Sequence, residues 1–95
     1  MIEPYIYTFE ELPILPGLLA SGKAELVSAG EGYEGEFYVK AVKLDGSEVF
    51  LSRLPQYQFE SSIFKAIARA LIDDKTTHGK NAAEEWAEHE KSYLD

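Results

Sequence analysis

Two stretches in the middle of the chain alternate between apolar and polar side chains. Residues 23–29 and 36–44 both follow this pattern, which is typical of β-strands that have one buried face. Asp45-Gly46 comes after the second stretch and favours a two-residue hairpin into a third strand over residues 47–51. The pattern therefore predicts a three-stranded antiparallel β-meander.

The turn and the strand charges also predict how the strands pair. A two-residue loop places Val42 opposite Val49, and in the first hairpin Glu25 pairs with Lys40 as opposite charges. Side chains alternate across a sheet, so one face collects a dry set: Ala24, Leu26, Phe37, Val39, Ala41 and Phe50. The second face collects Val27, Tyr38, Val42, Leu44, Val49 and Leu51. This second face is too apolar to be wholly solvated, so we expect residues 14–19 or a second subunit to cover it.

The last third of the chain changes to helical periodicity. Apolar residues recur three or four positions apart from Phe59 to Ile72, which predicts an amphipathic helix over about residues 59–73. Thr77 is a candidate N-cap for a last helix, whose thin, alanine-rich apolar side is anchored by Trp86. We expect both helices to pack on the dry face of the sheet.

The N-terminal region gives a weaker pattern. Tyr5, Tyr7 and Phe9 alternate with other side chains and favour a short fourth strand at the edge. Between residues 10 and 22, prolines, glycines and aliphatic residues predict an irregular segment that ends in a short helical turn. The sequence thus predicts one α+β domain over residues 1–95, with a three-stranded antiparallel meander, a short N-terminal fourth strand as an option, and two C-terminal helices on one face.

Composition limits the classes of protein that fit. The chain has 95 residues and is 45% hydrophobic, which is enough for one ordinary core. It contains no cysteine, which removes disulfides and thiolate metal sites and favours the reducing cytoplasm. The N-terminus lacks the features of a signal peptide, and no apolar run approaches the ~20 residues that cross a bilayer. We therefore expect a cytoplasmic protein that does not associate with membranes.

The net charge of −8 opposes direct binding of nucleic acid or anionic lipid. The charge is uneven along the chain. Residues 1–36 carry seven acids and one base, residues 37–72 carry three acids and five bases, and residues 73–95 carry seven acids and three bases. Either the helices and strands simply carry solvated charges, or the acidic ends form a surface for a basic protein partner.

Residues 30–35 match the G-x-G-x-x-G spacing of nucleotide-binding loops. A dinucleotide site needs a helix after the glycines, whereas strand-forming residues follow here, and two glutamates occupy the place of a phosphate. We interpret the run as the loop of the first hairpin, with no cofactor bound. Its tip, Glu31, Tyr33 and Glu34, is an acidic and aromatic recognition candidate.

Side chains suited to catalysis or metal binding are sparse. There is no cysteine and no G-x-S-x-G motif, and the adjacent acids are typical of a solvated surface. Glu85 and His89 share a helix face at a spacing of four residues, but a metal site needs three or four ligands. The sequence therefore predicts no catalytic, metal or cofactor residues, and a non-enzymatic protein.

The function that fits best is a small protein-interaction module that forms a homo-oligomer through the second sheet face. The predicted interface residues are Leu15, Leu18, Leu19, Val27, Tyr38, Val42, Val49 and Leu51.

Two alternatives stay open. Acidic side chains can imitate the phosphates of a nucleic acid and inhibit a DNA-handling or defence protein, a strategy of small phage and mobile-element proteins. Besides the loop tip, the acidic candidates for such recognition are Glu84, Glu85 and Glu88 on the last helix. The other alternative is a small enzyme whose site the sequence patterns do not reveal.

Overall fold

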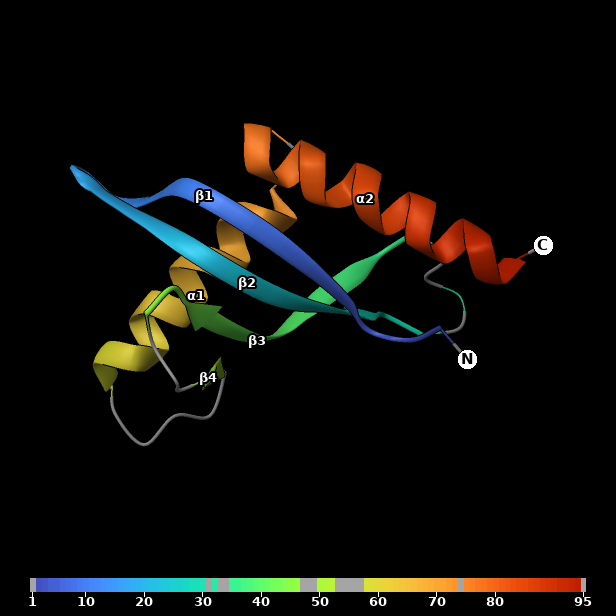
Figure 1. Ribbon diagram of the computed structural model, residues 1–95, viewed down its shortest axis with the longest axis horizontal. Helices are drawn as coiled ribbons and strands as arrows, with labels where there is room; N and C mark the ends of the chain where they lie inside the picture. Colours follow the sequence, from blue (N-terminus) through green and yellow to red (C-terminus); the bar gives the residue numbers. More distant parts are fainter. Residues whose placement is uncertain are drawn as a thin grey trace.

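A computed structural model of the chain describes residues 2–30, 32, 35–46, 50–52, 58–73 and 75–94. The elements are β1 (Tyr5–Leu15), β2 (Leu18–Ser28), β3 (Phe37–Leu44), β4 (Phe50–Ser52), α1 (Gln58–Ile72) and α2 (Thr77–Leu94). The strands form one antiparallel sheet in the order β1-β2-β3-β4 (Figure 1). The predicted α+β class is confirmed, since an antiparallel meander is followed by two C-terminal helices that contact the sheet.

The N-terminal third is one long hairpin, so the prediction of an irregular segment over residues 10–22 was wrong. Leu15 pairs with Leu18 across a turn formed by Pro16 and Gly17. Proline suits the second position of a tight turn, and Gly17 has the positive φ of 77° that favours glycine at the third. Pro13 is tolerated in β1 because this strand lies at the edge of the sheet.

A β-bulge divides this hairpin. The pairing of β1 with β2 skips between Phe9 and Leu12, where Glu11 has a φ of 51° and its N–H donates to the Ser21 hydroxyl at 3.0 Å. Between these pairs β1 advances three residues while β2 advances two, and the extra residue lets both Phe9 and Leu12 point into the core. Beyond the bulge, residues 10–21 form a two-stranded extension, here called the arm, that reaches past the end of β3 (Figure 1).

A second bulge lies between β2 and β3. Leu26 pairs with Val39, the neighbouring pair that the predicted register implies. Glu25, however, pairs with Ala41 and not with Lys40, because β3 contains one extra residue there. The extra residue reverses the alternation, and Val42 is fully buried in the core (0% exposed). The assignment of Val42 to the second face was therefore wrong.

The register of the last hairpin also differs from the prediction. Val42 pairs with Leu51, and Lys43 pairs with Phe50, so the connection is longer than two residues. The Asp45 N–H donates to the Ser21 carbonyl at 3.0 Å. Asp45 thus extends the hydrogen bonding of β3 with β2 by one residue. Val49 lies outside the described residues.

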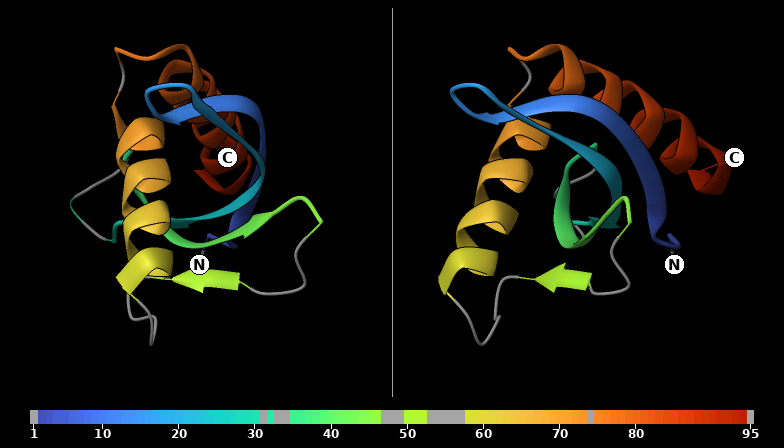
Figure 2. Two further views of the ribbon diagram at one scale, coloured as in Figure 1. Left: turned by 90° about the vertical axis from the view of Figure 1, so that its left-hand side faces the viewer. Right: turned by 60° about the vertical axis from the view of Figure 1, so that its left-hand side comes forward.

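Both helices pack on the same side of the sheet, which curves around them (Figure 2). The core joins buried residues of three strands and both helices: Tyr7, Phe9, Leu12, Ala20, Ala24, Leu26, Val39, Val42, Phe64, Ile67, Leu71, Ala82 and Trp86. The N-cap of α2 is Thr76, one residue before the predicted Thr77, because the Thr76 hydroxyl accepts the Gly79 N–H at 2.8 Å. None of the helices in the described ranges is long and apolar enough to cross a membrane.

Candidate functional site

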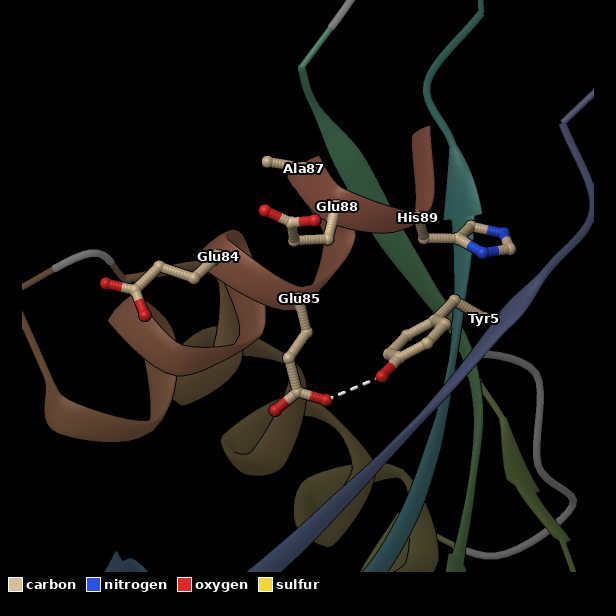
Figure 3. Close-up of a pocket in the computed structure, with 6 residues that line it drawn as sticks. All are labelled: Tyr5, Glu84, Glu85, Ala87, Glu88 and His89. Atoms are coloured by element: carbon tan, nitrogen blue, oxygen red, sulfur yellow. Dashed lines mark hydrogen bonds between the residues drawn. The ribbon is translucent and has the colours of Figure 1, made fainter. Parts of the chain in front are cut away.

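The most polar junction of the fold is the seam between β1 and α2. The Tyr5 hydroxyl donates to a Glu85 carboxylate oxygen at 2.6 Å, and the His89 ring lies 5.0 Å from the Tyr5 ring (Figure 3). A depression of about 730 Å³, shallow and open to solvent, lies over these side chains. It is lined by Tyr5, Glu84, Glu85, Ala87, Glu88 and His89.

His89 joins the N-terminus of the chain to α2. Its Nε2–H donates to the Glu3 carbonyl at 2.6 Å, since a carbonyl can only accept. The imidazole also contacts the rings of Trp86 and Tyr93, with centroids 5.4 and 5.3 Å away. The Tyr93 hydroxyl reaches a Glu3 carboxylate oxygen at 3.3 Å. This set of contacts stabilises the position of the first strand on the last helix.

Electrostatics keep the two seam tyrosines protonated. The hydrogen bond to Glu85 is the main cause that raises the pKa of Tyr5, with smaller contributions from burial and from the Glu85 charge. Burial is the main cause that raises the pKa of Tyr7, and the Glu85 charge adds to it. A hydrogen bond with Asn81 lowers the pKa of Tyr7 and offsets part of this rise.

The side chains at the seam form hydrogen bonds that hold β1 on α2. A phenol with a raised pKa remains a hydrogen-bond donor and is a poor general base or nucleophile near neutral pH. His89 uses Nε2 to hold the Glu3 carbonyl. Within the described ranges, no three His, Cys, Asp or Glu side chains are grouped so that they could hold a metal ion. The seam therefore explains how the first strand is held on the last helix.

Of the predicted acidic recognition residues, Glu84, Glu85 and Glu88 line the same depression but point in different directions (Figure 3). Glu84 and Glu88 are exposed on α2 and point away from Tyr5, whereas Glu85 points toward it (Figure 3). Glu31, Tyr33 and Glu34, the tip of the glycine run, lie outside the described residues.

The glycine run connects β2 to β3, as predicted for a hairpin loop. Sequence reasoning missed its anchor on α2: the Gly35 N–H donates to the Glu90 carboxylate at 2.9 and 3.1 Å. Glu90 is only 6% exposed. The sequence gives no signal of this burial, because Glu90 lies in a helical stretch of charged residues. Its neighbours Glu88 and Lys91 are exposed.

The sheet side opposite the helices is here called the open face. The ladder places on it the residues that alternate with the core positions: Ile6, Thr8, Leu19, Lys23, Glu25, Val27, Tyr38 and Lys40. No element among the described residues covers it, and in Figure 1 α1 lies behind the strands. Residues 14–19, one of the two expected covers, extend into the end of the arm.

The structure distributes the predicted interface residues over three places. Leu18 and Leu19 are exposed on the arm, and Tyr38 is exposed on the open face beside half-buried Val27. Val42 is in the core and cannot contact a partner. Leu15 ends β1, and Leu51 pairs with Val42 in the ladder.

Ile6 was missed as an interface candidate. It is 52% exposed on the open face and lies between Tyr5 and Tyr7 in β1. The sequence pattern predicted a shorter strand here. The alternation of Tyr5, Tyr7 and Phe9 was the available signal, because it places Ile6 on the opposite side.

Comparisons found no protein-family model, no curated protein and no solved structure that resembles this chain. The function is therefore argued from the surfaces of the molecule itself.

Proposed function

We propose that this protein is a non-enzymatic interaction module that self-associates through the open face. The supporting observation is the asymmetry of the sheet. One face is buried under two helices, while the other leaves Ile6, Leu19 and Tyr38 with exposed fractions of 52%, 56% and 42%. Large apolar side chains that share an uncovered face are a common feature of protein-binding surfaces.

The size of the open face indicates a weak complex. Three strands at a spacing of about 4.8 Å and a strand length of about 36 Å give a footprint of roughly 500 Å². Stable interfaces bury about 800 Å² per partner. The dissociation constant of the self-association is therefore expected to be micromolar or higher. The fraction of associated protein should rise with protein concentration.

Sedimentation equilibrium over a wide range of concentrations tests the proposal. The apparent mass should rise above the monomer value of 10.7 kDa as the protein is concentrated. Substituting Ile6→Ser and Tyr38→Ser should return it to the monomer value, because both changes remove apolar area from the open face.

Ile72→Ser is the matched control, since Ile72 is 53% exposed at the end of α1, away from the open face. This variant should associate as the wild type does. A wild type that stays monomeric at every concentration contradicts the proposal, and so does an Ile6→Ser, Tyr38→Ser variant that associates normally.

A further inference from the structure

Charge is distributed unevenly along the open face. Its arm end carries Glu10 and Glu11, both exposed and located at the bulge opposite Ser21. The other end, here called the body, carries the exposed lysines Lys23 and Lys40. Even when Glu25 is counted with these lysines, the body carries less negative charge than the arm. The chain as a whole has a net charge of −8. The open face is therefore polarised along the strand direction.

Apolar side chains occur at both ends of the same face. Leu18 and Leu19 are exposed near the tip of the arm, and Ile6 and Tyr38 are exposed on the body. Each end thus combines aliphatic or aromatic area with charged side chains, which are glutamates on the arm and two lysines beside Glu25 on the body. A surface of this kind is complementary to itself only when opposite ends meet.

Resting on the self-association proposed above, we propose that two copies stack their open faces antiparallel, so that the arm of each copy covers the body of the other. A twofold axis near Gly22, close to the middle of β2, produces this arrangement with identical contacts on both sides. Glutamates of the arm then face lysines of the body, and leucines of the arm face Ile6 and Tyr38. Parallel stacking instead places like charges together, which weakens association.

Charge reversal in two variants tests the arrangement. The arm variant carries Glu10→Lys and Glu11→Lys, and the body variant carries Lys23→Glu and Lys40→Glu. Each variant alone should dimerise at least about tenfold more weakly than the wild type, because like charges then meet at both contacts. An equimolar mixture of the two variants should dimerise within about threefold of the wild type, since every contact again joins opposite charges.

Two control variants separate this effect from net charge. Glu84→Lys with Glu88→Lys matches the charge change of the arm variant, and Lys65→Glu with Arg69→Glu matches that of the body variant. All four residues are exposed on the helices. The controls should dimerise nearly as the wild type does. If they lose dimerisation as strongly as the arm and body variants, or if the mixture fails to recover it, the antiparallel arrangement is wrong.

Thiol cross-linking gives a readout of orientation that is independent of charge. The chain has no cysteine, so Leu19→Cys and Tyr38→Cys each introduce one reactive group. A short bifunctional thiol reagent should join Leu19→Cys to Tyr38→Cys in a mixture, and should join Leu19→Cys to itself far less. Dominant self-linking of Leu19→Cys overturns the arrangement while self-association stands. A wild type that stays monomeric, together with cysteine variants that give no cross-link, overturns both proposals.

Discussion

The two faces of this sheet are built from the same strands and serve different ends. On the concave face, Phe9, Leu26 and Val42 pack against both helices and exclude water. On the open face, apolar residues alternate with lysines and glutamates and remain accessible. The comparison shows that the stability of the monomer is concentrated on one side of the sheet. The other side leaves large apolar side chains such as Ile6 and Tyr38 exposed.

The sharpest test of this difference is to truncate one large side chain on each face. Trp86→Ala should lower the free energy of unfolding by about 3–5 kcal/mol, because Trp86 is fully buried in the core. Tyr38→Ala on the open face should change it by less than about 0.5 kcal/mol. Urea denaturation of dilute, monomeric protein measures both.

A second variant at Trp86 refines this result. Its Nε1 is buried and has no hydrogen-bond partner among the described residues, so Trp86→Phe removes an unsatisfied donor along with some volume. Trp86→Phe should therefore cost clearly less than Trp86→Ala. Equal losses in the two variants would show that the core does not depend on aromatic packing at this position.

Gly22 tests how tightly the concave side is packed. A Cβ at this position would lie 2.3 Å from the Lys43 carbonyl oxygen, so Gly22→Ala should force β2 and β3 apart. The expected loss of stability is about 1–3 kcal/mol, measurable by thermal unfolding. Lys23→Ala, at the adjacent exposed position, should be nearly neutral. If both changes are neutral, the close contact between β2 and β3 is not maintained in solution.

Glu11 provides a smaller test from the open side. Its left-handed φ of 51° is unfavourable for a side chain with a Cβ. Glu11→Gly should therefore stabilise the monomer by up to about 1 kcal/mol, whereas Glu11→Val should destabilise it. The opposite order in chemical denaturation would contradict the bulge geometry.

The smallest expected effect concerns pH. Glu85 raises the pKa of Tyr5 and Tyr7 in the folded protein above the ordinary value of 10.0. The resulting stabilisation is present below pH 10 and is lost as the pH rises through the folded-state values. In Glu85→Gln the pKa of Tyr5 should fall toward 10, and the pKa of Tyr7 should fall less because burial is the main cause that raises it. Ultraviolet absorbance at alkaline pH detects both changes. An unchanged titration would contradict the contact between Glu85 and Tyr5.

Much of the architecture could be predicted because it depends on periodicity. The helical spacing from Phe59 to Ile72 predicted α1 closely, and the pairing of Leu26 with Val39 followed from strand alternation. The two bulges could not be predicted, because one extra residue leaves the local pattern almost unchanged while it reverses which side chains point inward. Val42 was placed on the wrong face for this reason.

Sequence reasoning missed the N-terminal hairpin and the hydrogen bond between Gly35 and Glu90 of α2, here called the tether, for different reasons. Pro13 and Pro16 suggested a broken segment, although an edge strand and a tight turn both accept proline. The contact of Glu90 with Gly35 joins positions 55 residues apart, and no local pattern carries information over that separation. Of the predicted second face, Tyr38 is exposed, whereas Val42 lies in the core.

The tether between Gly35 and Glu90 also constrains the order of folding. Glu90 belongs to the last turns of the final helix, and Glu3 and Tyr5 at the other end of the chain bind the same helix. During synthesis the N-terminal strands leave the ribosome first, yet their anchors are made last. The β-sheet therefore gains these contacts only after α2 has been synthesised, and a chain that stops before α2 lacks them at both its first strand and its glycine loop.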